Sequence, residues 1–285
     1  MSAQTDVTHD IDAAVQRYED DGVALLPGFL DVPTLFAPLW EQIRDVLDMC
    51  RAECGLPPSE GDAFDSGLPE LVKTNRQVAG KAYDAVRKVS AYYAIATSAA
   101  VWELVGRLIR TDFPGWYSQG SGIRMDHPGE EQFLSPWHQE YVFHLNSLDL
   151  LTLWIPLVPV DQTVGSVIFC PGSQREGLLP IYLDDPLNTN RNSAKTSEIA
   201  NLDRYLARYP ETSMDTTPGD IVAFHGLTLH RSRPNASPRT RWSMQLRYFN
   251  FRDAQGRQTF WTGGMTAGVD LGTIHPEAVI ERPDA

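Results

Sequence analysis

The sequence predicts one domain in which helices pack outside an all-β core, either a sandwich or a barrel. Three observations lead to this class. Apolar residues recur at helical spacing over about residues 10–110. Over about residues 116–251, short apolar or alternating segments are separated by Pro, Gly, Asn and Asp, as in sandwiches and barrels. The 285 residues, 42% of them hydrophobic, suffice for one large domain, 1–285.

The first part of the chain is predicted to be a helical layer with one early strand. Apolar residues at helical intervals in residues 11–18 indicate a helix that an Asp-Gly pair ends. The apolar run 23–26 indicates a strand, and a second helix follows it. Residues 55–76, rich in Pro and Gly, predict a loop. Helix returns over 78–109, where Ser98 is placed to cap a separate helix.

The second part of the chain, about residues 116–251, is predicted to form the β core. A polar insertion, 184–213, interrupts it and contains one short helix near 202–208. Long insertions of this kind are often lids or binding loops. A tail, 252–285, follows the core. Strands are predicted near residues 116–125, 137–145, 149–158, 164–169, 214–217, 220–224 and 240–251.

Charge and composition exclude several classes of partner. The net charge of −13 repels phosphate backbones and anionic lipid, so we expect neither nucleic acid nor a membrane as partner. The first residues show no basic region before an apolar stretch, which predicts a cytoplasmic protein. Cys50, Cys54 and Cys170 are expected to be reduced thiols, because a lone CxxxC pair is a weak metal signal. A monomer or a homodimer is expected.

His138 and Glu140 are the first part of a candidate metal site. Residues two apart in a strand point to the same side, so a strand over 137–145 projects both side chains together. Two imidazoles and one carboxylate can hold a divalent iron and leave its opposite face open, as in the facial triad of non-haem Fe(II) oxygenases. A His-x-Glu pair alone is more often two ordinary surface or core polar residues.

His230 supplies the missing imidazole ninety residues after Glu140. It follows the apolar strand 220–224 and precedes a turn-rich run. A cationic strand face begins eleven residues later, with alternate positions apolar. A buried arginine there needs an anion, and a guanidinium can hold a carboxylate through two parallel bonds. The polar face of this strand carries Arg241, Ser243, Gln245 and Arg247.

Matching stretches now point to a known family. They keep their order and spacing over most of residues 10–250, and the chain resembles the phytanoyl-CoA dioxygenase (PhyH-like) family of Fe(II)/2-oxoglutarate-dependent oxygenases. The stretches are Tyr18-Glu19-Asp20-Asp21-Gly22, Trp137-His138-Gln139-Glu140, Leu153-Trp154-Ile155-Pro156-Leu157, Gly165-Ser166-Val167, Pro171-Gly172-Ser173, Pro218-Gly219-Asp220, His225-Gly226, His230-x-Ser232-x-Pro234-Asn235 and Arg241 to Arg247-Tyr248.

The resemblance implies a fold, a cofactor and a cosubstrate. The core is expected to be a double-stranded β-helix of the jelly-roll or cupin-like kind. Iron is expected on the His138, Glu140 and His230 side chains, with O2 as cosubstrate. The distal carboxylate of 2-oxoglutarate is expected on Arg241, with Ser232 assisting. Gln119, nineteen residues before His138, stands where related enzymes place a cosubstrate-binding Gln on a strand.

Glu140 departs from the family, which usually has Asp at this position. Glu is one methylene longer but still supplies a carboxylate oxygen, so we expect the iron site to survive. Gly or Ala would instead open a halide position, as in the related halogenases. Glu140 therefore argues against halogenation.

The implied reaction is hydroxylation of a small-molecule metabolite or natural-product intermediate, with release of succinate and CO2. The same site can run desaturation, ring formation or epimerisation. The rival from another class is a cupin-like metal-binding protein that is no oxygenase. Arg241 and Ser232 discriminate, because a protein that only binds metal needs no carboxylate clamp.

Arg124 and His144 are candidates for contact with the substrate. Arg124 binds an acidic substrate group or pairs with a protein carboxylate. His144 shares the strand face of Glu140 at roughly 13 Å, taking about 3.3 Å per residue, and is otherwise a core histidine. The remaining alternatives are His225 as a structural residue or a ligand, Asp126-His127 as another iron pair, Arg239 in place of Arg241, Trp154 as core or cosubstrate contact, and Thr262-Gly263-Gly264-Met265 as a closing segment.

Overall fold

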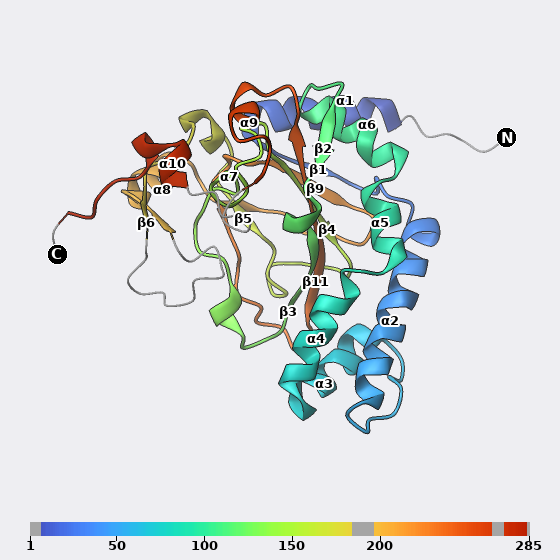
Figure 1. The fold of residues 1–285 in the computed structure, drawn as a ribbon. Coiled ribbons are helices and arrows are strands. Elements are labelled where there is room, and N and C mark those ends of the chain that lie inside the picture. Colours follow the sequence, from blue (N-terminus) through green and yellow to red (C-terminus); the bar gives the residue numbers. More distant parts are fainter. Residues whose placement is uncertain (1–6, 184–196, 264–270, 284–285) are drawn as a thin grey trace.

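An antiparallel sheet of six strands forms the centre of the molecule, and helices cover one of its faces (Figure 1). The computed structural model describes residues 7–183, 197–263 and 271–283. The strand order is β1-β9-β4-β11-β2, with β3 also paired to β11. The strands are β1 Val23–Leu26, β2 Pro114–Trp116, β3 Gly122–Asp126, β4 Leu151–Pro156, β5 Ile168–Phe169, β6 Ile181–Leu183, β7 Ser197–Ile199, β8 Thr212–Ser213, β9 Ile221–His225, β10 His230–Arg231 and β11 Arg241–Asn250.

The helical layer is more divided than predicted. The helix expected over 78–109 is three helices, and the Ser98 hydroxyl caps the last of them by accepting from Val101 N. The loop expected over 55–76 is wrong in its second half, because Leu68 and Leu71 are buried in a short helix. The helices are α1 Val7–Asp21, α2 Ala37–Ala52, α3 Leu68–Thr74, α4 Arg76–Val86, α5 Ser90–Ala96, α6 Ala99–Leu108, α7 Tyr141–His144, α8 Leu202–Arg208, α9 Ala254–Gln258 and α10 Leu271–Ile274.

The apolar face of β11 is what the helices cover. Trp242, Met244, Leu246 and Tyr248 are each 0% exposed. The Trp242 ring lies 4.8 Å from Phe64, and the Tyr248 hydroxyl donates to a backbone carbonyl of α5. Burial of each such side chain stabilises the fold by about 1.5–3 kcal/mol. The alternation predicted for this strand is confirmed, so its polar face points away from the helices.

A second, smaller sheet faces the polar side of the first. It has the strand order β10-β5-β8. The ring of Phe224, on β9, lies 5.2 Å from Phe169 of β5 and 4.6 Å from His230 of β10. Side chains of the two sheets therefore meet between them. The polar face of β11 lies in the same interlayer space.

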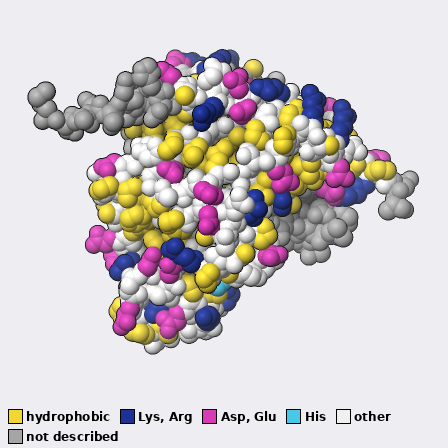
Figure 2. Space-filling model, turned by 180° about the vertical axis from the view of Figure 1, so that it is seen from behind, with side chains coloured by type: hydrophobic (Ala, Val, Ile, Leu, Met, Phe, Trp, Pro, Cys, Tyr) yellow, Lys and Arg dark blue, Asp and Glu magenta, His cyan; other side chains and the backbone are white. Residues whose placement is uncertain are grey.

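Two expected segments reach beyond the described residues. The insertion 184–213 includes 184–196, which lie outside them, while the short helix predicted near 202–208 is confirmed as α8. Of the candidate closing segment, residues 264–265 also lie outside. No helix in the described ranges is both long and apolar enough to span a bilayer. On the face shown in Figure 2, acidic and basic side chains are interspersed with hydrophobic ones.

Candidate metal centre

His138 and His230 are brought together by a short stretch of backbone pairing. Each residue's N–H donates to the other's carbonyl, over 3.0 Å from His138 and 3.1 Å from His230. The result is an isolated antiparallel bridge. The two ring centroids lie 4.1 Å apart. Pairing between distant parts of the chain thus sets two imidazoles side by side.

Glu140 completes the cluster from the end of the same segment as His138. Its Oε2 lies 3.3 Å from His230 Nε2 and 3.7 Å from His138 Nε2. The three candidate ligand atoms all lie within 4.8 Å of one another, and all three residues are buried. Within the described part of the chain, this is the one group of three or more His, Cys, Asp and Glu residues that converges in this way.

The histidine tautomers direct both Nε2 lone pairs toward the carboxylate. His138 Nδ1 lies 2.8 Å from the Pro136 carbonyl, and His230 Nδ1 lies 2.9 Å from the Thr228 carbonyl. A carbonyl oxygen only accepts, so each Nδ1 carries the proton and each Nε2 is free to bind a metal. Such outer hydrogen bonds fix the orientation of metal-binding histidines.

Charge states in the cluster also fit a metal. Burial, and then the neighbouring His138 ring, lowers the pKa of His230. Burial acts to raise the pKa of Glu140. The Arg247 charge, together with the close contacts of the His138, His144 and His230 rings, outweighs it and holds that pKa well below its usual range. Metal ligands must be neutral imidazole and ionised carboxylate. Two imidazole nitrogens and one carboxylate therefore form a donor set that suits non-haem iron.

The strand predicted over 137–145 is wrong beyond the bridge. Glu140 has helical backbone angles, φ −61° and ψ −35°, and directly precedes α7. One helical turn later, His144 Nε2 lies 2.7 Å from Glu140 Oε1, not roughly 13 Å away as an extended chain requires. The i, i+4 spacing of a Glu and a His was the available signal for this contact.

Arg247 also contacts Glu140, a role that the sequence did not reveal. Its Nε donates to Glu140 Oε1 over 2.7 Å. Alternation placed Arg247 on the polar face of β11 but gave no partner. The helical turn at Glu140 turns the carboxylate toward this strand. Both oxygens of Glu140 therefore have defined neighbours.

Arg241 already has an anionic partner inside the protein. Its Nη2 lies 2.8 Å from Asp126 Oδ2, and its Nε donates to the same oxygen over 3.1 Å. Its Nη1 donates to the Gly165 carbonyl. Gly165 has φ +99°, and a Cβ there would lie 3.1 Å from Arg241 Nη1 and 2.8 Å from the Arg233 carbonyl. A glycine is therefore needed beside this guanidinium.

Arg124 shares the same carboxylate. Its Nε donates to Asp126 Oδ1 over 2.8 Å, and its Nη2 donates to the Phe133 carbonyl. Burial acts to raise the pKa of Asp126, but Arg124 and then Arg241 outweigh it and lower that pKa. With two guanidiniums and one carboxylate, this cluster has one excess positive charge. A small anion would balance it.

Two buried hydroxyls on the polar face of the larger sheet have no hydrogen-bond partner among the described residues. They are Thr152 Oγ1 and Ser243 Oγ. Thr152 pairs in register with Arg247, and Ser243 lies two residues from Arg241 on the same face of β11. An unsatisfied buried hydroxyl costs about 1–3 kcal/mol. These two hydroxyls can therefore hydrogen-bond to a polar ligand on this face of the sheet.

Ser232 and Gln119 differ in their placement. Ser232 continues the pairing of the two histidines, since its N–H donates to the Ser135 carbonyl over 3.0 Å and its Oγ accepts from Ser135 N. It is half-buried. Gln119 does not lie on a strand as predicted. It lies in a 3-10 turn, Ser118–Gly120, with an exposed side chain.

Three other candidate site residues have hydrogen-bond or ion-pair partners away from the three converging ligands. Arg239 donates to Asp65 over 2.8 Å at the surface. His225 Nδ1 accepts from Leu227 N, a structural role, and burial lowers its pKa. His127 Nδ1 lies 3.1 Å from a threonine hydroxyl. Trp154 is buried in the core, as expected.

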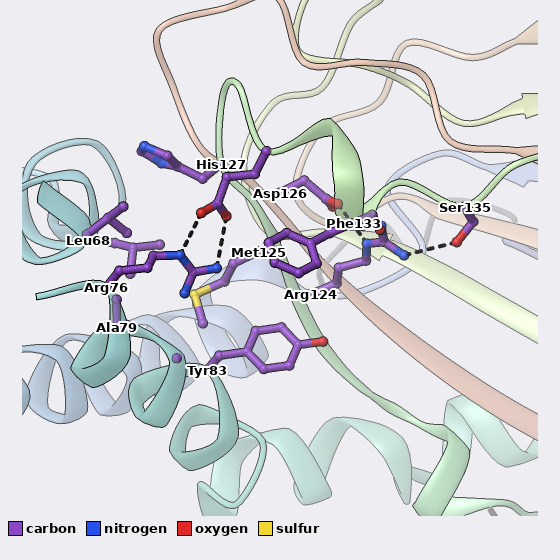
Figure 3. A pocket seen from close by; sticks show the side chains of 13 residues that line it. Leu68, Arg76, Ala79, Tyr83, Arg124, Met125, Asp126, His127, Phe133 and Ser135 are labelled. Carbon is purple, nitrogen blue, oxygen red and sulfur yellow. Dashed lines mark hydrogen bonds and ion pairs between the residues drawn. The ribbon is translucent and has the colours of Figure 1, made fainter. Parts of the chain in front are cut away.

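A cavity of about 410 Å³ lies outside the Asp126 cluster (Figure 3). Helices α3 and α4 form one wall, and strand β3 with the loop that follows it forms the other. Arg124 and Asp126 line its inner end together with Ser135, the backbone partner of Ser232. At its other end, Arg76 and Glu130 form an ion pair with an N–O distance of 2.6 Å. The cavity therefore adjoins the arginine cluster rather than the three converging ligands.

Comparison with known proteins gives hydroxylases as relatives. The 1-deoxypentalenic acid 11-beta-hydroxylase of Streptomyces arenae is 25% identical over 239 residues, covering 82% of this chain and 78% of that protein. The enzyme of the same name from Streptomyces exfoliatus is 29% identical over 110 residues. That alignment spans 38% of this chain and 37% of the relative's length.

Solved structures share the fold. The epimerase SnoN from nogalamycin biosynthesis, in complex with Fe3+, alpha ketoglutarate and nogalamycin RO, is 18% identical with a TM-score of 0.57 and covers 92% of this chain and 93% of that one. The carbocyclase SnoK from the same biosynthesis is 17% identical with a TM-score of 0.57, covering 92% and 95%. A family model for phytanoyl-CoA dioxygenase (PhyH) matches residues 18–243, which include all three converging ligands. The chain therefore belongs to the phytanoyl-CoA dioxygenase (PhyH) family, a group of non-haem iron dioxygenases.

Proposed function

We propose that this protein is an Fe(II)- and 2-oxoglutarate-dependent dioxygenase that hydroxylates an unactivated C–H bond of a small-molecule metabolite or natural-product intermediate. The observation that carries the proposal is the convergence of His138, Glu140 and His230. Family membership and the hydroxylase names of two relatives support it. The cytoplasmic location and the monomeric or homodimeric state stay predictions.

The metal would be held by Nε2 of His138, Nε2 of His230 and Oε2 of Glu140. Iron bound there supplies, with 2-oxoglutarate and O2, the oxidising power for C–H cleavage, and succinate and CO2 leave. The chain's own contribution is orientation and exclusion of water. Backbone carbonyls hold both imidazoles in the metal-binding tautomer, and each of the three ligands is at most 6% exposed.

The cosubstrate would lie along the polar face of β11. Arg241 carries the charge that a distal carboxylate needs, and the excess positive charge of its cluster with Arg124 and Asp126 remains to be balanced. The unpartnered hydroxyls of Thr152 and Ser243 offer hydrogen bonds on the way to the metal. Ser232 assists Arg241 in this proposal. For Arg124, the pairing with Asp126 favours a supporting role over contact with the substrate.

The two facing sheets would form a double-stranded β-helix with the iron between them. The His138–His230 bridge adds to the edge of the smaller sheet, and Glu140 reaches the larger one through Arg247. Residues 1–285 would be one oxygenase domain. Gln119 lies in the turn whose Gly120 carbonyl accepts from Arg247.

The same cofactors can support other outcomes. One solved structure of the same fold is an epimerase and another is a carbocyclase. Ring formation, desaturation and epimerisation therefore remain alternatives within the proposed cofactor class. Analysis of the product by mass separates hydroxylation, which adds one oxygen, from epimerisation, which leaves the mass unchanged, and from desaturation and ring formation, which each remove two hydrogens.

Anaerobic titration of the metal-free protein with Fe(II) and then 2-oxoglutarate tests the cofactor class. We expect a visible metal-to-ligand charge-transfer band in the wild type. It should be absent from His230→Ala and require far more 2-oxoglutarate in Arg241→Met. His225→Asn, which keeps an acceptor for Leu227 N, is the matched control and should retain the band. Absence of the band together with tight zinc binding would instead support the cupin-like alternative.

A further inference from the structure

The two carboxylate oxygens of Glu140 have different surroundings. Oε2 faces the Nε2 atoms of His138 and His230 at 3.7 and 3.3 Å. Oε1 faces the opposite way and accepts from Arg247 Nε and His144 Nε2, each over 2.7 Å. Hydrogen bonds to an ionised acceptor are among the strongest in proteins. One oxygen is therefore left for a metal, while two donors occupy the other.

Both donors are themselves held in place. Arg247 Nη2 donates to Gln245 Oε1 over 2.8 Å, and its Nη1 donates to the Gly120 carbonyl. The His144 ring lies 5.3 Å from the Tyr117 ring in an edge-on contact. A Cβ on Gly120 would collide with Tyr117 and lie 3.0 Å from His144 Nδ1. The absence of a side chain at Gly120 lets both rings close on this position.

We propose that Arg247 and His144 are positioning residues that hold Glu140 Oε1 and so present Oε2 alone to the metal. The inference rests on the proposed iron site. A free Glu side chain can bind a metal through one or both oxygens, because carboxylates ligate in either mode. Binding through both would consume a coordination position that the cosubstrates need. With Oε1 occupied by two fixed donors, Glu140 acts as a single-oxygen ligand.

The length of Glu140 is essential to this arrangement. Its carboxylate bridges two groups, the histidine pair on one side and the Arg247–His144 pair on the other. Asp is one methylene shorter, so its carboxylate cannot keep both sets of distances. A Glu140→Asp protein is therefore expected to bind metal without support from His144.

A double-mutant cycle read by Co(II) calorimetry tests the proposal. Removal of an outer partner of a metal ligand typically costs tenfold to a hundredfold in affinity, so His144→Phe should weaken Co(II) binding by about tenfold or more. His144→Gln keeps an N–H donor and should recover most of the affinity. In a Glu140→Asp background, His144→Phe should change affinity by less than about threefold, because the coupling is gone.

The spectrum of bound Co(II) gives a readout that general destabilisation does not move. The intensity of its visible ligand-field bands falls as coordination number rises. We expect weaker bands in His144→Phe and Arg247→Met, where one of the two donors to Oε1 is lost and binding through both oxygens becomes more favourable, and wild-type bands in His144→Gln. Arg252→Met, which removes an exposed arginine paired with Asp112, is the control and should leave affinity and spectrum unchanged.

The outcomes separate this inference from the proposed function. If His230→Ala binds Co(II) as well as the wild type, the cluster is not the metal site and both fail. If His230→Ala loses Co(II) but His144→Phe has wild-type affinity and spectrum, only the positioning role is overturned. An equal loss from His144→Phe in the wild-type and Glu140→Asp backgrounds also overturns it, since that pattern reports a structural defect.

Discussion

Two arginine–carboxylate pairs on one strand face of β11 differ in their charge balance. Arg247 and Glu140 lie at the metal end, and Arg241 and Asp126 lie six positions back along the strand. In the first pair the carboxylate has an oxygen directed at two histidines. In the second, the single carboxylate is shared with Arg124, so cations outnumber anions. We propose that the first pair presents an open carboxylate oxygen to a metal cation and that the second leaves a positive charge for an anion.

The hydrogen bonds of the two pairs also explain why charged groups can be buried at both ends of this strand face. A buried charge is costly unless it is paired and hydrogen-bonded. Every arginine concerned also donates to a backbone carbonyl or a side-chain oxygen besides its carboxylate. The pairs keep these buried charges compensated in the ligand-free protein. We expect ligands to complete the arrangement at the open Glu140 oxygen and at the additional arginine. We expect substitutions at the two ends to separate metal binding from cosubstrate binding.

The largest expected effect is on stability, from Asp126→Asn. It leaves two guanidiniums without their shared counter-ion, and removal of one partner of a buried pair typically costs about 3–5 kcal/mol. Urea unfolding at pH 7 measures the loss. Asp112→Asn, which breaks the exposed pair with Arg252, should leave the free energy of unfolding essentially unchanged. Equal effects of the two substitutions would contradict the shared role of Asp126.

Glu140→Gln should abolish metal binding at the other end. The amide keeps the size of the side chain but loses the charge that binds a divalent cation, so we expect Co(II) affinity to fall by at least about a hundredfold. Calorimetry on the metal-free protein measures it. Asp126→Asn, where still folded, should bind Co(II) as the wild type does. A Glu140→Gln protein that kept its metal affinity would show that the cluster is not the site.

Arg241→Met should affect the cosubstrate and spare the metal. Loss of charged hydrogen bonds costs about 1.5–3 kcal/mol, which corresponds to roughly a tenfold to hundredfold rise in the Kd for 2-oxoglutarate. Co(II) affinity should stay unchanged. Arg239→Met, at the surface beside Asp65, is the matched control. If Arg239→Met weakened 2-oxoglutarate binding and Arg241→Met did not, the assignment of the two arginines would be reversed.

The smallest expected effect is the acid sensitivity of the metal-free protein. Burial lowers the pKa of His225 from its ordinary value of 6.5. The neutral ring therefore contributes stability that is fully present above about pH 6.5 and is lost as pH falls toward the lower folded-state value. Each such proton changes the free energy of unfolding by at most about 1.4 kcal/mol per pH unit. Unfolding measured from pH 8 to pH 5 should show a shallower decline in His225→Asn, and identical slopes would contradict the assignment.

The sequence predicted the parts of the site that depend on alternation and spacing. The polar and apolar faces of β11 follow from period two, and the histidine and glutamate ligands follow from residue type and the family resemblance. The partners of Arg241 and Arg247 do not follow in this way. Arg241 meets Asp126 because β3 pairs with β11 in one register, which no local pattern fixes.

The backbone conformation at Glu140 likewise could not be predicted from the local sequence. An apolar and aromatic run after His138 favours a strand, yet the chain turns into α7 as Tyr141 N donates to the Gly226 carbonyl. That bond comes from a strand end far along the chain. Tertiary pairing therefore overrode local preference at the one residue where a strand would have separated His144 from Glu140.

An anaerobic crystal structure of the Fe(II) and 2-oxoglutarate complex, with anomalous scattering at the iron edge, tests the two-ended arrangement most directly. We predict one iron on His138 Nε2, His230 Nε2 and Glu140 Oε2, with Oε1 still on Arg247 and His144. The distal carboxylate should lie against Arg241. Iron at another site, or the distal carboxylate on Arg247, would contradict the account.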